Sequence, residues 1–271
     1  SFLIILYFMQ EFHLGPQPNK EPSKADINII EKLLGPEAAA KYKGTGEGSE
    51  SRKDVGYTPS VEDLSGLETL KKEQAIQERK EQEKNIAESK RQMSEWAKAS
   101  EVDEKYIAKH VTYEPNGDII WEGECNFSFK ETVTTFPPNL KEVRGVLDIR
   151  NTKIESLKGC PSSVTELYCS GTNIDSLKGC PSSVIELHCN DTNIESIADC
   201  PSSVIELVCS RTNIKSLKGC PLSVTKIYCF GCEKLTEIPV GLYTDLVIYL
   251  SKSKKELAAD AETKGYKVTY F

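Results

Sequence analysis

The chain has 271 residues, with 34 Lys and Arg against 41 Asp and Glu, which gives a formal net charge of -7. This length allows one domain with extensions or two small domains. The modest negative charge argues against nucleic-acid binding, which needs a basic surface. No run approaches the roughly 18 apolar residues that span a bilayer, and the apolar residues 2–8 lack a basic start. We therefore expect neither a membrane partner nor a signal peptide.

Residues 1–60 are predicted to be largely unstructured. Within them, residues 24–35 place Ile27, Ile30 and Leu33 near helical spacing, which predicts one short helix. Residues 43–60 are rich in Gly, Ser and charged residues and favour a linker. The GTGEG run in this segment follows no clear strand and opens no helix, so a linker is favoured over a nucleotide-binding loop.

Residues 61–110 are predicted to form one long charged helix or a bent pair. The segment mixes charges of both signs at helical spacing, and its sparse apolar residues do not keep a heptad. We expect a solvated helix whose last turns, with Met93, Trp96, Tyr106 and Ile107, pack on the part that follows. The alternative is a helix that self-associates or binds a partner.

Short extended runs begin after His110. Asn116 and Gly117 lie between β-rich segments, a pattern that predicts a hairpin. We expect residues 111–146 to form this hairpin, an N-terminal cap and a degenerate repeat.

A period of twenty residues occupies 147–250. The segment CPSSVTELYCSGTNIDSLKG begins at Cys160, and similar copies begin at Cys180, Cys200 and Cys220. One copy is too small to bury its own apolar face, so the copies must stack. Apolar and polar residues alternate near the end of the V-x-E-L-x-C motif, which predicts a short strand in each copy. Stacking of the copies would then form a parallel sheet.

The five most regular positions of the first full copy hold Val164, Leu167, Cys169, Thr172 and Ile174. The next two copies fill them with Val184, Leu187, Cys189, Thr192 and Ile194, and with Val204, Leu207, Cys209, Thr212 and Ile214. This pattern resembles the leucine-rich repeat family, L-x-x-L-x-L-x-x-N-x-L, with Cys at the third Leu and Thr at the Asn. The Thr hydroxyl can still bond the backbone there.

The resemblance implies an α+β chain: a curved parallel β-solenoid with short convex returns and an N-terminal helical arm. The length of the repeat is similar to that of the short class in bacterial effectors. Residues 251–271 are expected to form a C-terminal cap, with a helix over 254–264 and a closing strand over 266–270.

The chain has 10 cysteines, and most of them step by twenty. The two columns consist of Cys160, Cys180, Cys200 and Cys220, and of Cys169, Cys189, Cys209 and Cys229. Such columns are too long to converge on one zinc ion, and their parallel Cβ vectors suit disulfides poorly. We expect free, buried thiols and a reducing, cytoplasmic compartment. The Cys229-x-x-Cys232 spacing leaves redox chemistry as a weaker alternative.

The sequence indicates neither an enzyme nor a cofactor or metal site. The three histidines, His13, His110 and His188, are far apart, and no nucleophile–His–acid set accompanies them. The repeated carboxylates recur because the repeat recurs.

The outward positions of the repeat strands, which the resemblance places on the concave face, combine aromatic and charged residues. This composition is typical of a protein-binding face. The candidate binding residues are Glu166, Tyr168, Glu186, His188, Asp191, Glu206, Val208, Arg211, Lys226, Tyr228 and Phe230.

We therefore expect a non-enzymatic module that binds a protein partner on its concave sheet. The family resemblance also allows a targeting part of a ubiquitin-ligase-type effector, secreted into the cytosol of a host cell. A third hypothesis is a structural protein that self-associates through residues 61–110.

Overall fold

The computed structural model describes residues 61–270, with side chains from Lys72 onward. The short helix predicted at 24–35 and the linker predicted at 43–60 lie outside the described residues. The chain divides into two compact units between Lys80 and Glu81. Among the described residues, no helix is long and apolar enough to cross a membrane.

Helix α4 (Val61–Ala99) begins in the first unit and ends in the second. Side chains 72–80 are all exposed, including Ile76. This segment is helical because Lys, Glu, Gln and Ala are strong helix formers, although it has no continuous apolar stripe. In the last turns, by contrast, Met93, Trp96 and Ala97 are buried. The helix is therefore solvated at one end and packed at the other.

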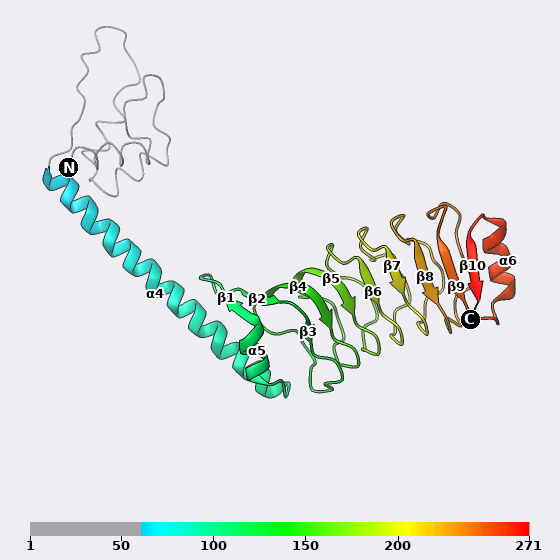
Figure 1. Ribbon diagram of the computed structural model, residues 1–271, viewed down its shortest axis with the longest axis horizontal. Helices are drawn as coiled ribbons and strands as arrows, with labels where there is room; N and C mark the ends of the chain where they lie inside the picture. The colour runs from blue at the N-terminus through cyan, green and yellow to red at the C-terminus, as the bar shows by residue number, and fades with distance from the viewer. Residues whose placement is uncertain (1–60, 271) are drawn as a thin grey trace, which may run out of the picture. The chain divides into compact units, whose positions relative to one another are not determined.

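Ten strands of the described residues form one sheet in the order β1-β2-β4-β5-β6-β7-β8-β9-β10, with β3 beside β4. The repeat strands are β5 (Ser162–Tyr168), β6 (Glu186–His188), β7 (Glu206–Val208), β8 (Lys226–Cys229) and β9 (Val247–Leu250). They pair in parallel, and Leu167, Leu187 and Leu207 lie side by side. The predicted α+β class and parallel β-solenoid are confirmed (Figure 1).

The interior of the solenoid is lined by apolar columns. In the coil of β5, the side chains of Val164, Leu167, Cys169, Ile174 and Leu177 are fully buried. Their equivalents in the following coils are buried in the same way. Each buried Leu or Ile stabilises the fold by about 1.5–3 kcal/mol, and only stacking removes these side chains from water.

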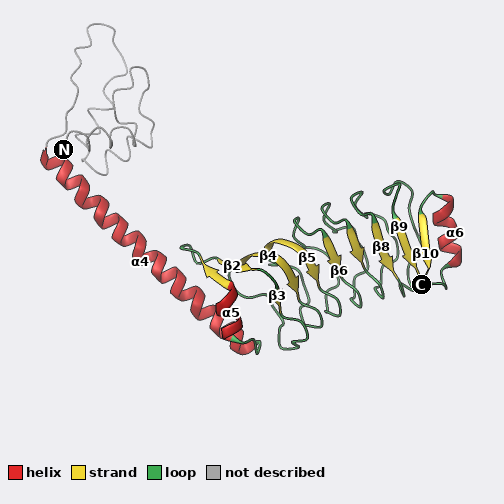
Figure 2. Cartoon of the chain, viewed as in Figure 1, coloured by secondary structure: helices red, strands yellow, loops and turns green. Residues whose placement is uncertain are grey.

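The segments that connect β5 to β9 contain no helix (Figure 2). Ser156, Ser176, Ser196 and Ser216 occupy the same turn in successive coils, and each hydroxyl accepts a hydrogen bond from the backbone N–H two residues later. Such local bonds satisfy a turn without a helix. The coils can therefore remain as short as twenty residues.

The N-terminal end of the sheet is covered by α4, by helix α5 (Glu104–His110) and by the hairpin of β1 (Val111–Tyr113) and β2 (Ile119–Glu122). Strands β3 (Cys125–Asn126) and β4 (Leu140–Asp148) complete the first coil. Aromatic rings fill this end: Phe127 contacts both Trp96 and Trp121, with centroids 5.1 and 5.5 Å away. The cap therefore joins α4 to the solenoid.

The C-terminal end is covered by helix α6 (Lys255–Thr263) and strand β10 (Lys267–Tyr270), which pairs in parallel with β9. The Tyr266 hydroxyl donates to the Pro239 carbonyl at 3.0 Å and accepts from the Leu242 N–H. Lys264 Nζ donates to the Ile238 carbonyl at 2.7 Å. These bonds attach the cap to the last coil.

Candidate functional site

The outward-facing residues of β5–β9 form a surface that we call the strand face. It consists of Glu166, Tyr168, Glu186, His188, Glu206, Val208, Lys226, Tyr228, Val247 and Tyr249. Equivalent residues of successive repeats pair between neighbouring strands. The outward positions therefore form two parallel rows. One row runs from Glu166 to Val247, and the other runs from Tyr168 to Tyr249. The structure thus brings together the eight strand residues proposed from sequence.

The row of carboxylates is held by partners on the same face. The Tyr168 hydroxyl donates to Glu166 Oε2 at 2.6 Å, and His188 Nε2 lies 2.7 Å from Glu186 Oε1. Each of these pairs is two residues apart on one strand, where side chains point to the same side. Glu206 is instead paired with Lys226 of the next strand, at 3.2 Å.

The aromatic residues on and next to the strand face gather into two groups. In the first, Tyr168 and His188 meet edge to face with centroids 4.7 Å apart. In the second, Tyr228 and Tyr249 stack with centroids 4.2 Å apart, and Phe230 lies 6.1 Å from Tyr228. Val208, which is half-buried, separates the two groups in the row.

Two tyrosines of the strand face, Tyr168 and Tyr228, are neutral at physiological pH because their pKa values are raised. The hydrogen bond to Glu166, followed by burial, raises the pKa of Tyr168 above its ordinary value near 10. Burial, followed by the charge of Glu206, raises the pKa of Tyr228. A raised pKa keeps a phenol protonated, so negative charge on this face comes from the carboxylates.

Arg150 and Asp148 extend the strand face towards β4. The Arg150 guanidinium donates to both oxygens of Asp148, whose side chain is 2% exposed. The same guanidinium lies over the Tyr168 ring, 5.5 Å from its centroid. The chain therefore already places one cation on an aromatic ring of this face.

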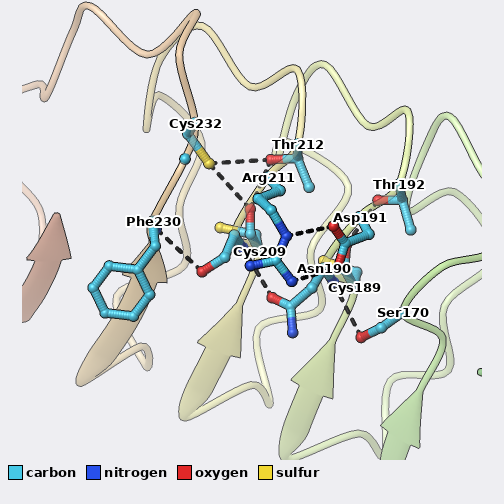
Figure 3. Close-up of polar contacts among 12 residues, drawn as sticks. Ser170, Cys189, Asn190, Asp191, Thr192, Cys209, Arg211, Thr212, Phe230 and Cys232 are labelled. Carbon is cyan, nitrogen blue, oxygen red and sulfur yellow. Dashed lines mark hydrogen bonds and ion pairs between the residues drawn. The ribbon is translucent and has the colours of Figure 1, made fainter. Parts of the chain in front are cut away.

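Asp191 and Arg211 lie in the turns that follow β6 and β7 rather than on the strands. Arg211 donates to both carboxylate oxygens of Asp191, at 2.5 and 2.6 Å (Figure 3). Both residues have a φ of 55°, a left-handed conformation that Gly171 and Gly231 occupy in the flanking coils. This pair joins consecutive coils.

A ladder of polar side chains runs beside these turns (Figure 3). Ser170 Oγ accepts from the Asn190 N–H, Asn190 Oδ1 accepts from the Ser210 N–H, and Ser210 Oγ accepts from the Phe230 N–H, at 3.2, 2.9 and 3.1 Å. Phe230 has no side-chain acceptor and ends this series. The hydrogen bond from the Phe230 N–H to Ser210 holds the backbone of Phe230, and the Phe230 ring lies beside Tyr228.

A second row, of threonines, closes each strand on the inner side. The hydroxyls of Thr152, Thr172, Thr192 and Thr212 each donate to the carbonyl three residues earlier, at 2.7–2.8 Å. The predicted hydrogen bonding of these threonines to the backbone is thus confirmed. Cys232 takes this position in the next coil, where its thiol lies 3.1 Å from the Cys209 carbonyl.

The cysteines of the described residues are all free, and all but Cys160 and Cys180 are buried. Cys209 Sγ and Cys229 Sγ lie 3.6 Å apart, and Cys232 Sγ lies 3.4 Å from the Thr212 hydroxyl. Burial raises the pKa of Cys180 and Cys220 to about 12. Within the described part of the chain, no group of three or more His, Cys, Asp or Glu residues is arranged to hold a metal ion.

The structure adds three residues that the sequence pattern did not single out. Tyr249 joins the second aromatic group, and Ile185 and Ile205 precede Glu186 and Glu206 with exposed fractions of 45% and 47%. The isoleucines were visible as apolar residues in the second position of the V-x-E strand motif. Tyr249 lies 21 residues after Tyr228, so the period of twenty does not predict its place.

Comparison with protein-family models and with curated proteins gives no match for this chain.

Proposed function

We propose that this chain is a non-enzymatic leucine-rich-repeat module that binds a protein partner on the strand face. The observation that supports it is the outward row Tyr168, His188, Val208, Tyr228 and Tyr249, in which aromatic rings stand among charged side chains. Aromatic residues dominate the binding energy of protein interfaces.

The side chains of the strand face are held by contacts with one another, which favours binding. Its side chains come from hydrogen-bonded strands, and hydrogen bonds or ring contacts fix Tyr168, His188 and Tyr228. A surface that is ordered before binding loses less conformational entropy when the partner docks.

The leucine-rich-repeat assignment is supported by the threonine row. In the family pattern an Asn occupies this position, and here the Thr192 and Thr212 hydroxyls bond the backbone in its place. The strands on one side and short returns on the other agree with a repeat of this kind.

A binding role is favoured over catalysis by the state of the reactive groups. Glu166 and Glu186 are engaged by their neighbours on an open sheet, and most thiols are buried in the core. The free cysteines also favour a reducing compartment, such as the cytosol of the producing cell or of a host cell.

The proposal is tested by affinity capture from an extract of cells that express the protein. Three baits are compared: wild type, the double variant Tyr168→Ala/Tyr228→Ala, and Tyr243→Ala as an exposed aromatic control outside the strand face. We expect one set of proteins to be captured by wild type and by Tyr243→Ala and lost with the double variant. Equal capture by all three baits, or by none, would overturn the proposal.

A further inference from the structure

We propose that the partner presents a basic segment to the strand face, with Lys or Arg side chains over Glu166 and Glu186 and an apolar side chain over Tyr228 and Tyr249. This inference rests on the proposed function and specifies the chemistry of the partner.

The first reason is the charge of the face. The parallel pairing places Glu166, Glu186 and Glu206 on successive strands, with about 4.8 Å between neighbouring strands. Like charges at such positions repel. Lys226 provides a permanent positive charge for Glu206 only, at 3.2 Å.

The partners of the other two carboxylates are neither Lys nor Arg. Glu166 is bonded by the neutral Tyr168 phenol, and Glu186 by the imidazole ring of His188 rather than by a Lys or Arg side chain. Arg150 is engaged by Asp148. Two carboxylates are therefore left without a permanent cation.

The second reason is the position of the aromatic rings beside these carboxylates. A cation over a Tyr face is attracted by the ring, and Arg150 already lies 5.5 Å from the Tyr168 centroid. A guanidinium from a partner would combine a carboxylate bond with ring stacking. Ammonium and guanidinium groups therefore complement this end of the face.

The other end of the face favours an apolar group. Tyr228, Phe230 and Tyr249 form a contiguous aromatic cluster, with centroids 4.2–6.4 Å apart. Four strand steps of about 4.8 Å separate Glu166 from Tyr249 in register, roughly 19 Å in total. About 6 extended residues or about 13 helical residues span that distance.

The test is a selection of random 12-residue peptides displayed on phage against the full-length chain. We expect the enriched peptides to carry at least two Lys or Arg residues and one large apolar residue. The leading peptide is then synthesised, and its affinity is measured by fluorescence anisotropy at two salt concentrations. Added salt is expected to weaken the binding, because the charges are near the surface.

The decisive variant is Glu166→Gln/Glu186→Gln, which keeps the shape of both side chains and removes two charges. We expect it to weaken the leading peptide at least tenfold. The matched control, Glu155→Gln/Asp175→Asn, removes two exposed carboxylates from the returns that follow the strands and should leave the affinity unchanged. Circular dichroism checks that both variants are folded.

Equal affinity of wild type and Glu166→Gln/Glu186→Gln would overturn the inference. Enrichment of acidic or uncharged peptides would also overturn it; if their binding is lost in Tyr168→Ala/Tyr228→Ala, the proposed function stands. The inference and the proposed function fail together in two cases. Either no peptide is enriched, or the affinity of the leading peptide is unchanged in both Glu166→Gln/Glu186→Gln and Tyr168→Ala/Tyr228→Ala.

Discussion

Tyr228 and Tyr249 stack face to face across β8 and β9, with ring centroids 4.2 Å apart and planes within 8° of parallel. The two residues are paired in register although 21 positions separate them. The last coil thus carries one extra residue and still delivers an aromatic ring to the row that contains Tyr168 and His188. The row of outward residues therefore continues to the C-terminal end of the repeat sheet.

The stack predicts a measurable coupling between the two tyrosines. Aromatic pairs contribute about 0.5–1.5 kcal/mol beyond their buried area. In a double-mutant cycle of Tyr228→Ala and Tyr249→Ala, followed by urea unfolding, we expect a coupling energy of about 1 kcal/mol. A cycle of Tyr249→Ala with Tyr243→Ala is the control and should show additivity. Additivity in both cycles would contradict the stack.

The threonine row predicts a specific cost for losing one hydroxyl. Thr192→Val keeps the shape but removes the donor that bonds the Cys189 carbonyl at 2.7 Å. We expect it to lower the free energy of unfolding by about 1–3 kcal/mol, because a buried acceptor loses its partner. Thr192→Ser retains the hydroxyl and should cost less. The free energies are measured by urea unfolding, and a smaller loss for Val than for Ser would refute this role.

The packed end of α4 predicts that Trp96 stabilises the solenoid. Trp96→Ala removes the ring that contacts Phe127 and the bond from Nε1 to the Thr135 carbonyl at 3.1 Å. We expect a loss of about 3–5 kcal/mol in the free energy of unfolding. Ile76→Ala, in the exposed part of α4, should change it by less than about 0.5 kcal/mol. Similar values for the two variants would show that α4 does not dock through Trp96.

The buried thiols predict that the fold is sensitive to alkaline pH. Burial raises the pKa of seven thiols, those of Cys125, Cys160, Cys169, Cys180, Cys189, Cys200 and Cys220. An unfolded thiol has a pKa near 8.5, so the unfolded chain loses these protons first as the pH rises. Their stabilising contribution is complete below about pH 8.5 and is lost as the pH rises towards about 12.

Urea unfolding at pH 7.5 and pH 10 measures this effect. We expect the midpoint to fall at pH 10, because the unfolded chain then releases thiol protons that the folded chain retains. Cys189→Val should reduce the number of protons released on unfolding at pH 10 by one. With a thiol reagent at pH 7.5, the folded chain should react slowly and the denatured chain completely. Fast reaction of the folded chain would contradict the buried columns.

The sequence predicts the repeat sheet well because residues one repeat period apart in the sequence are the residues that pair between neighbouring strands. Leu167, Leu187 and Leu207 are twenty residues apart, and stacking coils of equal length must place them side by side. Glu166 and Glu186 follow them for the same reason. The outward rows of the strand face could therefore be predicted as far as β8.

The repeat pattern does not predict which side chains bond one another. Asp191 and Arg211 are candidate binding residues because of their charge, and the sequence pattern did not predict that they bond one another across consecutive coils. The break between α4 and α5 has a local cause, since the Asp103 side chain caps α5 by accepting from the Lys105 N–H. The pattern of charges over 61–110 did not distinguish this bend from one continuous helix.

The most direct test of binding through the strand face is site-specific photo-crosslinking in cells that express the protein. A photoreactive benzoylphenylalanine replaces Val208, at the centre of the face, or Lys178, which is exposed in the return after β5. After irradiation, adducts are measured by mass on denaturing gels. Binding through the strand face predicts a discrete protein adduct from position 208 and none from position 178. An adduct from position 178 alone, or no adduct from position 208, would contradict it.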